Sequence, residues 1–170
     1  KILFIVKNKI MNKNYHRKFY NSSRFRIIHS ICLFLFKIRL PLIIRHGIAE
    51  IANIFSRIAL PPIKDGDIIP TVFDFHLSVS REDGDQYYYL GFYEIGTLNV
   101  MQHCLIEGDT FIDIGASVGQ MSLFASNLVG KSGKVLSFEP MKSRFFNLMK
   151  NNEFNNRTNI EIFNMALGDT

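Results

Sequence analysis

The second half of the chain alternates between short apolar runs and longer repeats of apolar residues at helical spacing. Strands are predicted at residues 110–114, 134–139 and 160–164, and helices at residues 93–106, 118–129 and 141–152. Strands that alternate with helices through short links form right-handed parallel crossovers, which pack the helices against a parallel sheet. The pattern therefore predicts an α/β fold, a Rossmann-like sandwich.

A different pattern precedes this region. Apolar and polar residues alternate from 72 to 80, which predicts a half-buried strand. A polar loop at residues 81–85 and an apolar run at 87–90 follow, so residues 72–90 are predicted to form a β-hairpin. His76 falls on the polar side of the alternation, where we expect a solvated rather than a catalytic histidine.

The apolar segment at residues 27–44 raises the question of a membrane span. Its twelve large apolar residues favour insertion by roughly 4 to 7 kcal/mol, whereas Lys37 and Arg39 near its centre cost about 2.5 to 3.5 kcal/mol each. Because these terms nearly cancel, we expect a helix that packs on the protein or lies at a membrane surface. A true anchor and a signal-like segment are the alternatives.

Three regions follow from these patterns. Apolar residues at helical spacing predict an amphipathic helix at 48–60, which Pro61 and Pro62 end. We expect a basic, apolar helical extension at residues 1–62, a β-hairpin region at 63–93 and an α/β domain at 94–170.

Charge divides the chain in the same way. Residues 1–60 carry twelve Lys and Arg against one acid, a net +11, whereas residues 61–170 carry eight against fourteen, a net −6. Together they give the formal net charge of +5. The basic character belongs to the first third, so the high isoelectric point does not indicate a nucleic-acid-binding protein.

The cysteines and histidines indicate no metal site. Cys32 and Cys104 lie in different segments without a surrounding motif, and the five histidines have no ligand spacing. A hydrophobic content of 47% excludes wholesale disorder.

The first candidate ligand-binding residues lie at the end of the first core strand. Asp113 is followed by Gly115 and Gly119 in the pattern D-x-G-x-x-x-G, at the turn into the next helix. Such a turn lies at the carboxyl edge of a parallel sheet, where nucleotide-like ligands bind. A carboxylate beside it suits a ligand with a cationic group better than one with phosphates.

A second carboxylate, Glu139, ends the next strand and lies 20 residues after Gly119. An acidic residue at about this spacing hydrogen-bonds a ribose diol in such folds. The pair Asp113 and Glu139 therefore predicts a nucleoside site.

Three motifs in this order and spacing resemble the FkbM family of S-adenosylmethionine-dependent methyltransferases. They are Asp113–Gly119, Phe138–Pro140 and Asn164–Asp169, and the resemblance runs from about Phe92 to the end of the chain. The family commonly has asparagine where this chain has Ser117. The resemblance implies the Rossmann-like sandwich of class I methyltransferases, with S-adenosylmethionine as the cofactor.

The resemblance also assigns roles to residues. Asp113 would face the methionyl ammonium, Glu139 would accept from both ribose hydroxyls, and Glu94 is an outside candidate for the same pocket. The close backbone turn would come from Gly115 and Ala116, and the adenine would lie by the backbone of Met165 and Ala166. Gly119, the last residue of the cofactor-binding turn, is predicted to let the helix and strand backbones approach closely.

The implied methyl acceptor is a hydroxyl oxygen on a sugar, a lipid or a secondary metabolite, not a nucleic acid. No catalytic residue can be named. We expect a cytoplasmic protein, in which contact of residues 27–44 with a membrane surface is the alternative to packing on the protein.

The resembling fold has seven core strands, of which the sequence supplies the first three. We therefore expect part of a longer or a decayed protein, with an open apolar edge along strand 110–114 that favours association. Two other readings stay open. One is a non-catalytic remnant, and the other is a nicotinamide-dependent oxidoreductase, which the absent middle glycine disfavours.

Overall fold

The computed structural model describes residues 66–71, 73–78 and 93–169, together with seven isolated helical positions between 27 and 51. The elements are β1 (Ile68–Pro70), β2 (His76–Ser78), α5 (Ile95–Cys104), β3 (Thr110–Ile114), α6 (Gln120–Val129), β4 (Lys134–Phe138), α7 (Lys142–Phe154) and β5 (Ile160–Phe163). The predicted return strand at 87–90 and most of the predicted helices at 27–44 and 48–60 lie outside the described residues.

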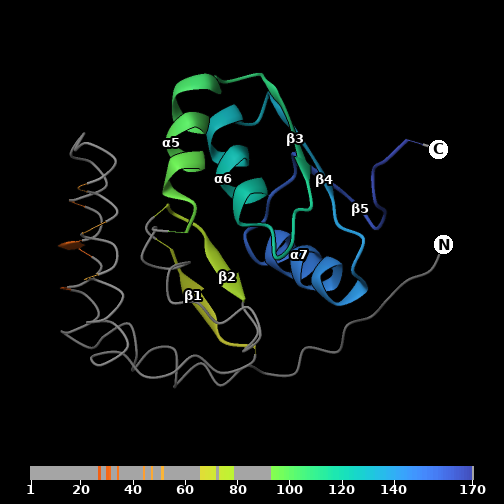
Figure 1. Ribbon diagram of the computed structural model, residues 1–170, viewed down its shortest axis with the longest axis horizontal. Coiled ribbons are helices and arrows are strands. Elements are labelled where there is room, and N and C mark those ends of the chain that lie inside the picture. The colour runs from red at the N-terminus through yellow and green to blue at the C-terminus, as the bar shows by residue number, and fades with distance from the viewer. Residues whose placement is uncertain are drawn as a thin grey trace.

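The core is the predicted parallel sheet, with strand order β3-β4-β5 (Figure 1). Helix α6 connects β3 to β4 along the chain, and helix α7 connects β4 to β5. Thr110 lies opposite Lys134 and Val135 opposite Ile160, so the three strands end at the same edge. The Rossmann-like α/β prediction is confirmed for these strands. Helix α6 begins at residue 120 rather than 118, because the backbone at Ser117 and Gly119 has positive φ angles that a right-handed helix excludes.

The two faces of the sheet differ in what covers them. Helix α6 packs on β3 and β4, and the side chains that alternate toward it, such as Val135 and Ser137, have no exposed surface. On the opposite face, Ile112 is 53% and Ile114 66% exposed. Strands β3 and β5 are the two outer ones of this sheet among the described residues. The exposed apolar face and outer edge of β3 remain a predicted site for association.

We expect Ile112→Lys to reduce self-association without loss of folding. Because the side chain is largely exposed, the free energy of unfolding should change by about 0.5 kcal/mol or less. Light scattering across a concentration series checks the first effect and urea unfolding the second. Ile160→Lys, on the covered face, is the contrasting variant and should prevent folding. Unchanged scattering by Ile112→Lys would show that this face does not drive association.

The first strand of the predicted hairpin differs from its prediction. Strand β2 (His76–Ser78) pairs antiparallel with β1 upstream of it, whereas the predicted partner at 87–90 lies outside the described residues. The segment between β1 and β2 is a turn, because the Thr71 hydroxyl donates to the Phe75 carbonyl at 2.8 Å and Asp74 has a φ of 67°. A side chain that hydrogen-bonds nearby backbone competes with strand pairing. The predicted strand over residues 72–80 was therefore wrong at residues 73–75, whereas residues 76–78 are strand. Asp74 and His76 are exposed as the alternation requires, but Ser78 is buried.

Two asparagines, Asn151 on α7 and Asn155 directly after its end, attach strand β2 to the core. Asn155 accepts the His76 backbone N–H at 2.8 Å and donates to its carbonyl at 2.7 Å. Asn151 does the same for Ser78, at 2.6 and 3.1 Å, and also donates to the Val118 carbonyl at 2.8 Å. Four residues of helix rise about 6 Å and two residues of strand about 6.6 Å. The helix thus presents two amide groups at the spacing of alternate strand residues.

Beyond the core, among the residues that the structure describes, no helix is long and apolar enough to cross a bilayer. The described positions Ile27, Ile31 and Phe34 are helical and exposed.

Candidate functional site

The turn from β3 to α6 depends on three residues with left-handed backbone. Gly115 has a φ of 81°, Ser117 of 49° and Gly119 of 92°. The backbone N–H groups of Gly115 and Ala116 both donate to the Phe138 carbonyl, at 2.9 and 3.0 Å. These bonds hold the turn against the carboxyl end of β4.

The two glycines are needed for different reasons. A Cβ at Gly115 would meet no atom within 4 Å, so only its φ angle favours glycine. A Cβ at Gly119 would lie 2.2 Å from Cδ1 of Leu148, which is fully buried on α7. Gly119 was predicted to permit close approach of strand and helix, but the close neighbour is a side chain of the following helix.

Asp113 lies at the carboxyl end of β3 and is 9% exposed. The Ser122 hydroxyl donates to its Oδ2 at 2.5 Å and also lies 2.7 Å from the Ser137 hydroxyl. Burial raises the pKa of Asp113, its bonds to Ser122 lower it, and the charges of Glu94 and Glu139 raise it further, so the net direction is upward. The site thus holds a desolvated carboxylate with two like charges nearby, an arrangement that a cationic group would stabilise.

We expect Asp113→Asn to stabilise the unliganded protein at neutral pH. Since the folded pKa is raised, the folded state binds the proton more tightly, and stability falls as the pH rises from about 4 through the folded pKa. Asparagine keeps the acceptor for Ser122 and removes this pH dependence. Urea unfolding of both proteins between pH 4 and pH 8 measures it, and identical pH profiles would contradict the assignment.

Glu139 follows β4 and is 4% exposed. Its Oε2 accepts the Ser117 backbone N–H and its Oε1 the Met141 N–H, both at 2.8 Å. The carboxylate therefore joins the glycine turn to the start of α7. Each oxygen has a second lone pair, so the group can still accept hydrogen bonds from a ligand.

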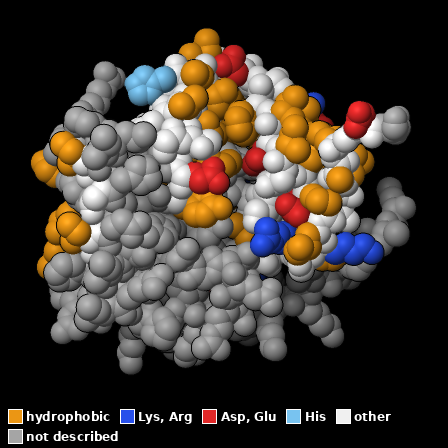
Figure 2. Space-filling view, in the orientation of Figure 1, with side chains coloured by type: hydrophobic (Ala, Val, Ile, Leu, Met, Phe, Trp, Pro, Cys, Tyr) orange, Lys and Arg blue, Asp and Glu red, His pale blue; other side chains and the backbone are white. Residues whose placement is uncertain are grey.

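Two further segments border the site. Glu94 precedes α5 with a φ of 47°, and its Oε2 accepts the Thr97 hydroxyl at 3.2 Å. After β5, the Asn164 amide donates to the carbonyls of Glu139 and Pro140, at 2.9 and 3.1 Å. Met165 is 48% exposed and Ala166 is also exposed. Figure 2 shows acidic side chains set among exposed hydrophobic ones on the described part of the surface.

The structure thus places four predicted residues at one edge of the sheet, namely Asp113, Gly115, Ala116 and Glu139. Gly119 lies at the end of the turn, directly before α6, and faces Leu148. Sequence reasoning missed the residues that hold them. Ser122 and Ser137 support Asp113, and Asn164 supports the backbone at Glu139. Small polar residues at buried positions of a helix and a strand were the available signal.

No family model matches the sequence, and no curated protein matches it. Solved structures of similar fold include a Clostridium thermocellum protein described as an rRNA methylase (TM-score 0.41, 22% identity, 42% of this chain and 39% of that chain). A second is a SAM-dependent methyltransferase from Aquifex aeolicus (TM-score 0.38, 22% identity, 42% of this chain and 37% of that chain). A third is Aeropyrum pernix fibrillarin with bound S-adenosyl-L-methionine (TM-score 0.36, 17% identity, 42% of this chain and 32% of that chain). The match thus spans well under half of each of these proteins, and the likeness concerns the fold of the core.

The described residues contain no cluster of three or more potential metal ligands. Cys104 is exposed and its thiol is free, whereas Cys32 lies outside the described residues.

Proposed function

We propose that the site binds S-adenosylmethionine and that the protein takes part in methyl transfer. The observation that carries the proposal is the placement of two buried carboxylates, Asp113 and Glu139, at the ends of adjacent parallel strands beside a glycine turn. Ligands of α/β sheets bind outside the carboxyl ends of the strands. A ligand that carries positive charge would stabilise the buried Asp113 carboxylate beside the like charges of Glu94 and Glu139.

The residues present fit this cofactor. Glu139 would accept from the ribose hydroxyls while its Ser117 contact keeps the carboxylate in place. Asp113, anchored by Ser122, would balance the charge of the methionyl ammonium, with Glu94 adding to the negative potential. The open space at Gly115 leaves room for close approach to the backbone, and the segment of Met165 and Ala166 would border the adenine.

When bound, the cofactor would supply a methyl group on a cationic sulfur, so that an acceptor nucleophile can bond to the methyl carbon while the carbon–sulfur bond breaks and a neutral thioether leaves. The contribution of this chain is to bind and orient the cofactor. We propose a hydroxyl oxygen as the acceptor, on the resemblance of the motifs Asp113–Gly119 and Asn164–Asp169 to the FkbM family. A fold does not select a substrate, so RNA is the competing acceptor class.

The test is calorimetric titration of the protein with S-adenosylhomocysteine. Glu139→Gln should weaken binding by about tenfold, or 1.4 kcal/mol, because an amide oxygen accepts from a hydroxyl less strongly than a carboxylate. Glu161→Gln makes the same change at an exposed residue that pairs with Lys134 and should leave binding unchanged.

Two outcomes would contradict the proposal. One is the absence of binding to the folded protein, and the other is equal weakening by both variants. Tighter binding of NADH than of S-adenosylhomocysteine would favour an oxidoreductase instead.

A further inference from the structure

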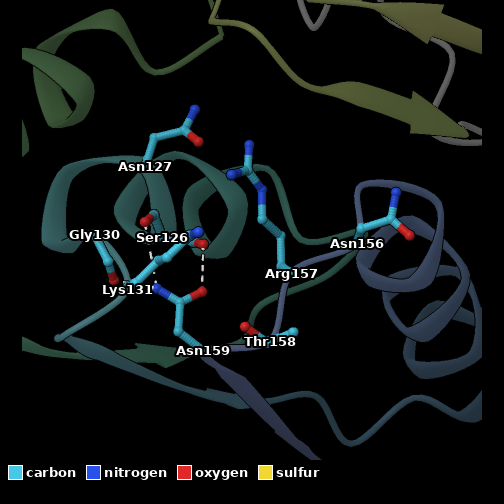
Figure 3. A pocket seen from close by; sticks show the side chains of 8 residues that line it. All are labelled: Ser126, Asn127, Gly130, Lys131, Asn156, Arg157, Thr158 and Asn159. Atoms are coloured by element: carbon cyan, nitrogen blue, oxygen red, sulfur yellow. Dashed lines mark hydrogen bonds between the residues drawn. The ribbon is translucent and has the colours of Figure 1, made fainter.

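A polar cavity of about 160 Å³ lies at the opposite edge of the sheet from the candidate site. It is formed by the end of α6, the turn before β4 and the loop between α7 and β5 (Figure 3). Asn159 immediately precedes β5, which places the cavity at the amino ends of the strands. At about 30 Å³ per water molecule, its volume equals that of about five waters.

The charge of the cavity is one-sided. Lys131 and Arg157 are its two charged lining residues, and its other members are amides, hydroxyls and a glycine. The carboxylate of Asp74 acts on Arg157 from outside the lining, yet burial outweighs it and lowers the pKa of the guanidinium. The Arg157 Nε is buried and has no hydrogen-bond partner. A buried donor without an acceptor is unfavourable.

The remaining polar groups form the wall. Asn159 donates to the carbonyls of Gly130 and Ser126, at 2.7 and 3.4 Å, and accepts the Ser126 hydroxyl at 2.6 Å. Asn127 donates to the Phe73 carbonyl at 2.8 Å. Carbonyls at the end of a helix repel anions, and here the Asn159 amide covers two of them.

The two cations come from different connecting segments, Arg157 from the loop between α7 and β5 and Lys131 from the turn before β4. In Figure 3, the Arg157 guanidinium extends away from Asn159 and lies between Asn127 and Asn156. Thr158, on the same loop, adds a hydroxyl to the lining.

We propose that this cavity binds a phosphate group, held by Arg157 and Lys131 with Thr158 and Asn156 at its border. A guanidinium can donate two parallel hydrogen bonds to phosphate oxygens through its terminal nitrogens. The site is separate from the carboxylates at the carboxyl edge, so it does not depend on the proposed methyl transfer. Its ligand is either inorganic phosphate or a phosphorylated small molecule.

The experiment compares thermal unfolding and calorimetric titration of the whole chain in inorganic phosphate, glycerol phosphate and chloride at equal ionic strength. Phosphate should raise the melting temperature above that in chloride. Arg157→Gln and Lys131→Gln should each weaken phosphate binding by about tenfold. Lys142→Gln removes an equal charge from an exposed position on α7 and should have no effect.

The two phosphate compounds identify the source of the ligand. Binding of glycerol phosphate as tight as that of inorganic phosphate supports a phosphorylated small molecule, and binding of inorganic phosphate alone supports the free ion. Equal melting temperatures in phosphate and chloride would overturn the proposal. So would equal weakening by Lys142→Gln, because both results would mean that the two cations only balance the C-terminal end of α6.

Discussion

Asn151→Ala is expected to destabilise the protein by about 3 to 4 kcal/mol. The side chain is 1% exposed and makes three hydrogen bonds, two to Ser78 and one to Val118. Alanine would leave one buried N–H and two buried carbonyls without partners, and water has little access to them. Urea unfolding followed by circular dichroism measures the loss.

Asn155→Ala is the matched control, four residues further along the chain and directly after the end of α7. It also bonds both backbone groups of its strand residue, His76, but that residue is exposed, so water can replace the amide and the cost should be about 1 kcal/mol. Asn151→Asp should be no better than alanine, because a carboxylate accepts the Ser78 N–H but cannot donate to the two carbonyls. Equal, small losses at Asn151 and Asn155 would contradict the role of Asn151 as the main attachment of β2.

Gly119→Ala is expected to cost about 3 kcal/mol, through left-handed backbone strain of about 1 to 2 kcal/mol and the overlap of its Cβ with Leu148. The Cβ would lie 2.2 Å from Leu148 Cδ1, and Leu148 has no exposed surface. The leucine must therefore move in a packed interior. Thermal or urea unfolding of the unliganded protein gives the value.

Gly115→Ala separates the two causes. Gly115 has a similar φ of 81° but no atom within 4 Å of an added Cβ, so the variant should lose only the backbone term of about 1 to 2 kcal/mol. The difference between the variants measures the overlap with Leu148. Equal losses would show that Leu148 moves aside at no cost and that the φ angle alone requires glycine at 119.

These packing contacts bear on the proposed cofactor site. Leu148 and Asn151 lie on α7, and they contact Gly119 and the Val118 carbonyl within the turn that follows β3. Glu139 connects the same turn to the start of α7. The position of the turn thus depends on a helix that contributes no predicted ligand contact, and variants of α7 are expected to weaken cofactor binding through the turn.

The sequence alone determined the elements whose signals are local. Strands β3, β4 and β5 follow from short apolar runs, the positive φ angles at 115 and 119 from glycine, and the carboxylates at the strand ends from their place after those runs. Parallel order then brought Asp113 and Glu139 to one edge, because right-handed crossovers between consecutive strands leave few other arrangements.

The tertiary structure decided what depends on residues far apart in the chain. Asn151 bonds Ser78 across 73 positions and Asn127 bonds Phe73 across 54, and the cavity around Arg157 forms where two loops meet a helix end. The pairing of β2 with β1 was missed because the Thr71 hydroxyl and the Asp74 backbone turn the chain within an alternating pattern. Hydrophobic periodicity records which side of an element is buried, whereas a hydrogen bond or a steric contact needs the position of its partner, which only the folded chain supplies.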